Sequence, residues 1–262
     1  MRNIFCILIF LTLCNFFLAS KSFAQSKGDI MLSTGIQFFA ARDEGFSSMN
    51  YRGNKSTSTL GFLLSKKNKT LYFLGDFSYG VIANSAGATI NELGLNYSHF
   101  TFYHRKKGKD QGLSWGWSNK NSFHLRRHNN FSNYNFRYDY YSALGPAARY
   151  ILPFQWKNKT FTWQSMASWQ LIGFQIKSGY TGAEPENYQT GNTLFNNFFN
   201  TVKTFTPFKD VDLGLSSTLY WKLQTNNELG LRYQFNYGKL SGIKNVHRVD
   251  HAIDLSLKVR IW

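Results

Sequence analysis

Apolar and polar residues alternate with a period of two along much of this chain, and the pattern is clearest in the last segment. Its apolar positions are Ile253, Leu255, Leu257, Val259 and Ile261. The polar positions between them are Asp254, Ser256, Lys258 and Arg260. Because successive side chains of a β-strand point to opposite faces, this pattern predicts a strand with one apolar and one polar face.

The same alternation recurs upstream and predicts ten strands. By periodicity they cover about 29–40, 57–65, 70–82, 89–104, 112–125, 134–151, 160–176, 210–224, 228–239 and 248–262. Breaks in the alternation near His99 and near Leu171–Ile172 predict β-bulges. Strands of this number and length predict an all-β, antiparallel transmembrane β-barrel of about ten strands, with a range of roughly 8–12 left open.

The connections between the predicted strands differ in length in a regular way. Every second connection is short, at 66–69, 105–111, 155–159 and 225–227, whereas the others include the long segments 41–56 and 177–209. Short turns on one rim and longer loops on the other are typical of membrane barrels, with the turns on the periplasmic side. The even strand number then predicts that the N- and C-termini are both periplasmic.

The first 24 residues have the features of a cleaved secretory signal peptide. Arg2 supplies positive charge, residues 4–18 are mostly apolar, and Ser22-Phe23-Ala24 places small residues at the cleavage site. We therefore predict a signal peptide over 1–24 and one barrel domain over 25–262. Both cysteines, Cys6 and Cys14, fall in the removed segment, so no disulfide is expected in the mature chain.

The composition agrees with a membrane barrel. Aromatic residues make up 18% of the chain although the mean hydropathy is −0.34, a mixture expected when half of each strand faces lipid and half faces a polar interior. After residue 24, the sequence has no run near the roughly 18 apolar residues of a transmembrane helix. The net charge is +16, and an exported chain rarely meets nucleic acid. We therefore expect membrane lipids and lipopolysaccharide as its partners, and no nucleic acid.

The predicted inner face carries charges of both signs. They are Asp76, Glu92, Arg137, Asp139, Asp212, Lys222, Arg232, Asp254, Lys258 and Arg260. Unpaired buried charge is costly, so we expect these groups to pair across a narrow lumen. Barrels of about eight strands are filled by side chains, and barrels of sixteen or more leave an aqueous channel. A wide pore is therefore not expected, whereas a narrow hydrated path stays open.

With these features the chain resembles small outer-membrane β-barrel proteins of Gram-negative bacteria. Its signal ending in Ser22-Phe23-Ala24-Gln25 and its Lys-, Asn- and Tyr-rich body look like those of Bacteroidetes-type members. The resemblance covers the whole mature chain and implies an integral outer-membrane protein that is inserted by the barrel-assembly machinery. In many such barrels the terminal aromatic shares the parity of the apolar row of the closing strand. Here Trp262 shares the parity of Arg260 instead.

Two groups of polar residues are candidates for chemistry at the outer rim. The first consists of Asp210, Asp212, His247, Asp250, His251 and Asp254. Paired carboxylates beside a His–Asp couple can activate a water molecule. The second is Ser122 with His124, which share one face of a strand and can form a nucleophile–base pair. Solvated rim residues are the alternative interpretation of both groups.

Two further segments are candidates for contacts. A basic group at the outer rim, which predicts binding to lipopolysaccharide phosphate, consists of Arg126, Arg127 and His128. Exposed apolar clusters often mark protein contacts, and the long loop holds such residues at Phe195, Phe198, Phe199 and Phe205. The mature chain lacks Cys and has no His spacing of the H-E-x-x-H kind, so no metal or other cofactor is expected.

The function predicted from these features is a non-enzymatic structural or accessory subunit of an outer-membrane complex. One alternative is a narrow porin or transporter for small solutes. The other is a rim enzyme that hydrolyses lipid or peptide. Planar-bilayer conductance separates the pore from the structural subunit, and substitution of His124 or His251 tests the enzyme.

Overall fold

The computed structural model of the protein describes residues 27–45, 47–66, 68–104, 111–129, 136–178, 188–242 and 244–261. The predicted signal peptide over 1–24 and the terminal Trp262 lie outside these described residues. The side chain of Phe198 also lies outside the description.

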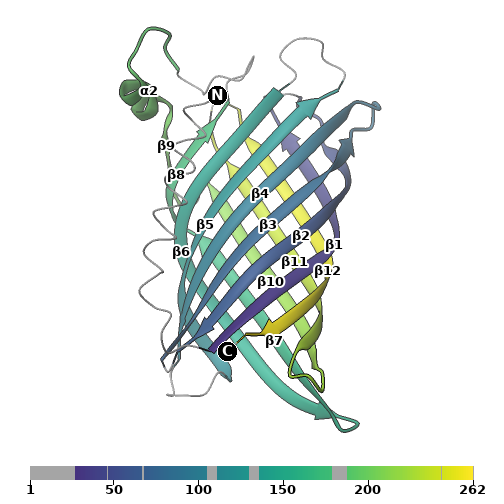
Figure 1. The fold of residues 1–262 in the computed structure, drawn as a ribbon. Helices are drawn as coiled ribbons and strands as arrows, with labels where there is room; N and C mark the ends of the chain where they lie inside the picture. The colour runs from purple at the N-terminus through teal and green to yellow at the C-terminus, as the bar shows by residue number, and fades with distance from the viewer. Residues whose placement is uncertain are drawn as a thin grey trace.

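The described chain forms one antiparallel sheet that closes into a barrel (Figure 1). Its strands are β1 (Lys27–Asp43), β2 (Tyr51–Ser65), β3 (Lys69–Ala83), β4 (Thr89–Tyr103), β5 (Gly112–His128), β6 (Phe136–Trp156), β7 (Lys159–Gln170), β8 (Ile172–Lys177), β9 (Lys203–Phe205), β10 (Val211–Lys222), β11 (Glu228–Leu240) and β12 (Val246–Arg260). A short helix, α2 (Leu194–Thr201), lies between β8 and β9 in the chain. The sheet closes because β1 pairs with both β2 and β12, and β5 pairs with β6.

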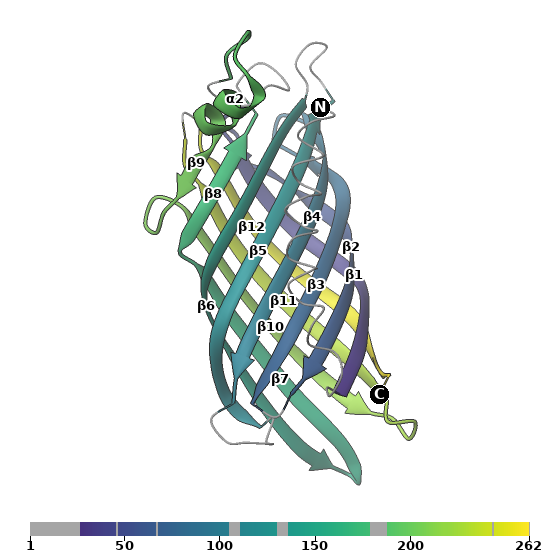
Figure 2. The same cartoon turned by 60° about the vertical axis from the view of Figure 1, so that its left-hand side comes forward.

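The barrel has ten strands, as the alternation predicted. β7 and β8 are two parts of one barrel strand, since both pair with β6. The short β9 pairs with β8, and β10 pairs with β7. β9 and β10 therefore together form the next strand of the barrel. The tilted strands run side by side around the whole wall in both views (Figures 1 and 2).

The predicted bulge near Leu171 is confirmed. Outward side chains are odd-numbered in β7, as at Trp163 and Trp169, but even-numbered in β8, as at Ile172. The extra residue, Leu171, donates its N–H to the carbonyl of Leu144 at 2.8 Å. One inserted residue moves the following side chains to the other face unless the backbone absorbs it, so the bulge keeps both halves facing lipid.

Two other sequence predictions are wrong in detail. β4 keeps one register with β3 and β5 along its whole length, so there is no bulge at His99. The alternation is obscured there because the inward residues Phe100 and Phe102 are apolar. The predicted long loop 41–56 is also shorter, because β2 begins at Tyr51. The outward residues of its first half are polar, so hydropathy could not mark the start of the strand.

The two rims of the barrel differ. The turn rim holds the short connections, including Lys157-Asn158, whose φ angles of 47° and 61° suit a two-residue hairpin turn. It also holds the start of β1 and the end of β12, where Asp29 pairs with Arg260. The opposite, loop rim holds the segment between β8 and β10, with α2 beside the barrel mouth (Figures 1 and 2).

The exterior of the barrel is apolar and the interior is polar. Large side chains exposed on the outside include Leu32, Ile36, Leu60, Phe62, Phe77, Leu95, Trp115, Trp117, Leu215, Leu231, Ile253 and Leu255. The buried residues include many charged and hydroxyl side chains on the inward parity of each strand. This inversion of the usual globular pattern is the one expected for a barrel that spans a membrane.

Candidate functional site in the barrel lumen

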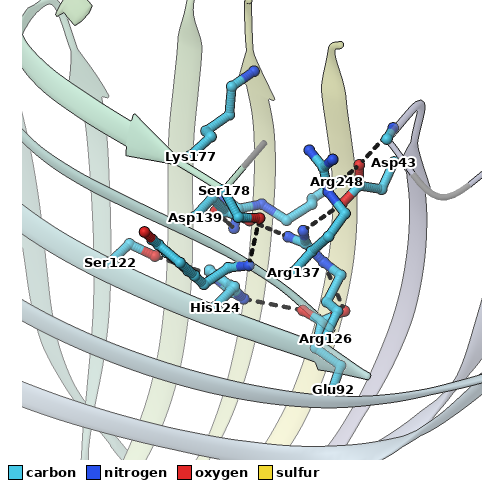
Figure 3. A network of polar contacts seen from close by, with 12 residues as sticks. Asp43, Glu92, Ser122, His124, Arg126, Arg137, Asp139, Lys177, Ser178 and Arg248 are labelled. Atoms are coloured by element: carbon cyan, nitrogen blue, oxygen red, sulfur yellow. Dashed lines mark hydrogen bonds and ion pairs between the residues drawn. The ribbon is translucent and has the colours of Figure 1, made fainter. Parts of the chain in front are cut away.

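Charged side chains from six strands meet inside the barrel near the loop rim (Figure 3). This ion cluster consists of Asp43, Lys55, Glu92, Arg126, Arg137, Asp139 and Arg248, all buried. The guanidinium of Arg126 lies 2.7 Å from Asp43 and 3.5 Å from Glu92. It also donates a hydrogen bond to Asp139. Each acid therefore faces a cation, which is the condition under which buried charge is tolerated.

The ion cluster crosses the lumen and does not merely line the wall. Arg248 on β12 lies 2.9 Å from Asp139 on β6, although β11, β10 and β7 separate these strands around the barrel. Arg137 on β6 approaches Asp43 on β1 at 3.3 Å. These pairs confirm the expectation that inward charges meet across a narrow interior.

A second polar layer lies next to the ion cluster, on the side of the turn rim. Lys120 on β5 contacts both carboxylate oxygens of Asp212 on β10 at 3.0 Å, and the hydroxyl of Tyr141 donates to the same carboxylate. On the other side, Arg232 lies 3.0 Å from Asp254 and donates to the Thr59 hydroxyl at 2.6 Å. Both layers link strands that are not neighbours in the sheet through charge-assisted hydrogen bonds.

Apolar side chains fill the lumen nearer to the turn rim. This apolar plug consists of Met31, Leu63, Tyr72, Phe102, Ala147 and Met166. Tyr72 and Phe102 meet edge to face, with ring centroids 5.8 Å apart. Arg149 on β6 covers the plug, since its guanidinium donates to the Tyr72 hydroxyl at 2.8 Å and lies 5.2 Å from the Phe102 ring centroid.

A cavity of about 110 Å³ lies in the interior at the level of the second polar layer. Its lining includes carboxylates at Asp76, Asp212 and Asp250, and cations at Lys120, Arg232 and Arg248. The formal charges of these six groups balance. A water molecule needs roughly 10–15 Å³ of such space and several polar partners, so the cavity has room for several waters or a small solute.

Ser122, His124 and Glu92 form a hydrogen-bonded chain at the boundary between the cavity and the ion cluster (Figure 3). The Ser122 hydroxyl lies 3.0 Å from Nε2 of His124, and Nδ1 of His124 lies 3.0 Å from a carboxylate oxygen of Glu92. The structure thus brings together the predicted Ser122 and His124. It places them inside the lumen, whereas the sequence analysis expected them at the outer rim.

The remaining predicted rim residues do not form one site. Asp212, Asp250 and Asp254 face the lumen, whereas His251 is exposed and contacts the Tyr233 hydroxyl at 2.6 Å. Asp210 is buried in the loop, where its carboxylate accepts from Gln175, from Thr206 and twice from Ser241. The His–Asp couple fails because neighbouring residues of a strand point to opposite faces.

The predicted basic group is also divided between the two faces of β5. Arg126 is the centre of the ion cluster, and His128 is buried with a ring nitrogen 2.9 Å from the Tyr51 hydroxyl. Only Arg127 of the three is exposed. The strand runs to His128, beyond the predicted end at 125, and this alternation separates the three side chains.

The phenylalanines of the long loop fall into different surroundings. Phe205 is fully buried and stacks on Tyr141 with ring centroids 5.7 Å apart. Phe195 and Phe199 lie one turn apart on α2 and are 71% and 62% exposed. Their ring centroids are 4.7 Å apart. Elsewhere on α2, Asn197 and Thr201 are buried, and the Asn197 side chain bonds the backbone of Gln189.

Other loops at this rim are tied to each other. The backbone of Glu44 donates to the carbonyl of Asn245 at 3.1 Å, and the Glu44 carboxylate accepts from the Asn245 N–H at 3.0 Å. The hydrogen bond from the Asn245 N–H to the carboxylate holds the pKa of Glu44 below its usual value. The charged carboxylate therefore joins the β1–β2 and β11–β12 connections.

The predicted closing strand corresponds to β12, whose pairing with β1 completes the sheet. Its odd-numbered residues point outward, and Ile253, Leu255, Leu257 and Ile261 are exposed. The backbone of Ile261 donates to the carbonyl of Gly28 at 2.9 Å, so pairing reaches almost to the chain end.

Within the part of the chain that the structure describes, no group of three or more His, Cys, Asp or Glu residues has an arrangement that could hold a metal ion. No helix among the described residues is long and apolar enough to cross a membrane.

No protein-family model and no curated protein matches the chain. Among solved structures, the translocator domain of the autotransporter NalP from Neisseria meningitidis is 9% identical with a TM-score of 0.43, covering 99% of this chain and 98% of that chain. The beta domain of the Bordetella autotransporter Brka is 11% identical, with a TM-score of 0.39 and coverages of 89% and 98%. A deletion mutant of the monoaromatic hydrocarbon channel TodX is 8% identical, with a TM-score of 0.37 and coverages of 93% and 93%. At these levels of similarity, function has to be argued from the residues of this chain.

Proposed function

We propose that this protein is an integral outer-membrane barrel with a closed lumen, which serves as a structural or accessory subunit of an outer-membrane assembly. The observation that carries the proposal is the pair of barriers inside the barrel. The ion cluster bridges opposite walls near the loop rim, and the apolar plug fills the lumen nearer to the turn rim. A solute would have to break several buried ion pairs and displace packed aromatic rings to pass.

The proposed orientation places the turn rim and both chain ends in the periplasm. The short turns and the ends of β1 and β12 share that rim, as in barrels whose turns are periplasmic. The loop rim then faces outward, where Arg127 can meet lipopolysaccharide phosphate. Assembly by the barrel-assembly machinery belongs to the same proposal.

The proposed contact with other envelope proteins lies on α2. Phe195 and Phe199 are largely exposed to solvent and contact each other, and α2 carries no charged residue. Exposed apolar side chains that lie together in this way often mark a contact with another protein. Double substitution of Phe195 and Phe199 by Ser should release co-purifying envelope proteins while leaving the barrel folded.

Planar-bilayer recording of the purified mature barrel tests the central proposal. We expect no stepwise conductance from protein whose heat-modifiable migration shows that it is folded. Reproducible single-channel steps from the folded wild-type protein would contradict a closed lumen. They would favour the narrow transporter, for which the polar cavity of about 110 Å³ is the supporting observation.

A further inference from the structure

We propose that Ser122, His124 and Glu92 form a nucleophilic site in the lumen that cleaves a small carboxylic ester which fits the cavity beside them. This activity goes beyond the proposed structural role and does not depend on it. The ester has to reach the cavity from one rim only, whereas conductance needs a path past both the ion cluster and the apolar plug. It rests on three side chains joined in a chain of hydrogen bonds and on the cavity that two of them line.

The hydrogen bonds have the order that a serine nucleophile requires. The Glu92 carboxylate, 3.0 Å from Nδ1 of His124, accepts the Nδ1 proton. Nε2 is then left with a free lone pair, and it lies 3.0 Å from the Ser122 hydroxyl. A carboxylate that sets the imidazole tautomer, followed by a base that faces the hydroxyl, is the arrangement by which serine is activated.

The ladder between β4 and β5 explains how two strands build this geometry. Ser122 and His124 are two residues apart on β5 and so point to the same, inward face. Gly94 lies directly opposite His124, and Glu92 lies opposite Arg126, one inward position further along. The imidazole therefore spans diagonally from its own strand to the carboxylate of the neighbouring strand.

Gly94 leaves the room that this imidazole occupies. A Cβ atom at position 94 would lie 3.3 Å from Cε1 of His124 and 2.6 Å from the Ser78 hydroxyl. An alanine there would have to shift the Ser78 hydroxyl and would press on the imidazole ring, and a longer side chain would take the space that the ring occupies. The register of β4 against β5 thus positions the three side chains, and Gly94 leaves space for the His124 ring. Sites built on paired strands of this kind are held rigidly.

Glu92 stays charged in the interior because cations surround it. Nζ of Lys55 lies 3.5 Å from the same oxygen that faces His124, and Arg126 approaches the other oxygen. A charged carboxylate both orients the imidazole and stabilises the imidazolium that forms during reaction. Glu92 is a positioning residue in this scheme, whereas Ser122 and His124 touch the reacting atoms.

The Ser122 hydroxyl has a second neighbour, the side-chain amide of Asn96, with its oxygen at 2.5 Å. A serine hydroxyl rotates, so its proton can be directed to Asn96 or to His124. Reaction requires the second direction. Asn96 lines the same cavity, and a side-chain amide is one of the groups that can donate to the negative charge that develops on a carbonyl oxygen.

The reaction balances without a cofactor. The Ser122 oxygen attacks the carbonyl carbon while Nε2 of His124 takes the hydroxyl proton. The bond from carbonyl carbon to alcohol oxygen breaks, and the alcohol leaves with that proton. Water then attacks the acyl-serine as His124 takes one of its protons, and the acid leaves while the Ser122 hydroxyl is restored. The limited cavity volume restricts the ester to short acyl groups.

The test uses the mature, detergent-folded barrel, with a fluorophosphonate as a serine-reactive probe and 4-nitrophenyl acetate as the ester. We expect covalent labelling of Ser122, located by peptide mass spectrometry, and ester turnover. Labelling disappears in Ser122→Ala, and the turnover of His124→Gln falls by about 10²–10⁴-fold. Ser33→Ala is the matched control, because it removes another buried hydroxyl of the lumen that does not line the cavity, and it should react like the wild type.

The expected effect of Glu92→Gln separates positioning from a merely structural role. It should lower kcat with little change in KM, because the amide cannot stabilise the imidazolium but leaves the cavity in place. Heat-modifiable migration checks that each variant is folded. Folded wild-type protein that takes up no probe, or a label that persists in Ser122→Ala, overturns the proposal.

Discussion

Neutralising Asp139 should destabilise the barrel far more than neutralising an equivalent acid at the rim. Asp139 is bound by Arg126 from the neighbouring strand and by Arg248 at 2.9 Å from the opposite wall. Two charges about 4 Å apart interact by roughly 4 kcal/mol at an effective dielectric constant near 20. Removing one partner of a buried pair costs about 3–5 kcal/mol, since the other charge stays buried. For Asp139→Asn we expect about 3 kcal/mol, because the amide oxygen still accepts one hydrogen bond.

Asp29→Asn is the matched control for this substitution. Asp29 also pairs with an arginine on a neighbouring strand, but the side chain of that partner, Arg260, is 46% exposed at the turn rim. Asp29 itself is buried, but the solvent around Arg260 screens the pair, and ion pairs screened by solvent contribute below about 1 kcal/mol. The two variants therefore differ in burial and in contact across the lumen, and not in the chemistry of the change.

The measurement is equilibrium unfolding by urea in lipid vesicles, followed by tryptophan fluorescence. Asp139→Asn should raise the unfolded-to-folded ratio by roughly 100-fold, since about 1.4 kcal/mol corresponds to a factor of ten. Adding Arg248→Met should recover part of the loss by removing the charge left without its partner. Equal midpoints for Asp139→Asn and Asp29→Asn would refute the argument that the ion cluster holds the walls together.

Two further predictions concern the packing of the site and the outer surface. Gly94→Ala should reduce probe labelling of Ser122 by displacing the His124 ring, whereas Gly75→Ala, whose nearest neighbouring atom is 3.8 Å away, should label normally. Normal labelling of folded Gly94→Ala would contradict the geometry. Leu255→Arg on the lipid-facing side should cost about 2–4 kcal/mol of unfolding free energy in vesicles, and Leu255→Met below about 1.5 kcal/mol. An equal effect of both changes would show that this face does not meet lipid.

The strands were predictable because each has one face in an apolar and one in a polar environment. In β12 the alternation from Ile253 to Ile261 is nearly complete, and its predicted range agrees with the observed strand to within two residues at each end. The same rule failed at the start of β2. There the outward positions Arg52 and Asn54 are polar, so both faces carry polar groups and the periodicity disappears.

Two of the three residues of the proposed nucleophilic site could be found from the sequence. A shared face for Ser122 and His124 follows from their spacing alone, but Glu92 requires the register of β4 against β5. The predicted turn 105–111 is centred on residue 108 and would place Glu92 opposite His124. The structure pairs Glu92 with Arg126 instead. A shift of two residues preserves every inward position, so hydropathy cannot detect it.

The contacts across the lumen could not be predicted from the sequence. The sequence predicts that charges such as Asp139 and Arg137 face inward, but their partners depend on barrel diameter and strand tilt. Arg126 illustrates the limit, since a basic run at a strand end predicts exposure. It became the centre of the ion cluster because β5 continues past residue 125 and turns alternate side chains inward.

Glu92 connects lumen closure with the proposed reactivity. One carboxylate oxygen faces both Lys55 and His124, and the other faces Arg126. The cations that hold this carboxylate in place for His124 are therefore the same ones that bridge the walls of the barrel. An open, conducting arrangement would have to separate Arg126 from its acids and would release Glu92 with it. One conformation of this barrel therefore cannot have both an aligned Ser122 site and an open pore. The aligned site requires Arg126 to stay paired with Glu92, and the open pore requires the two to separate.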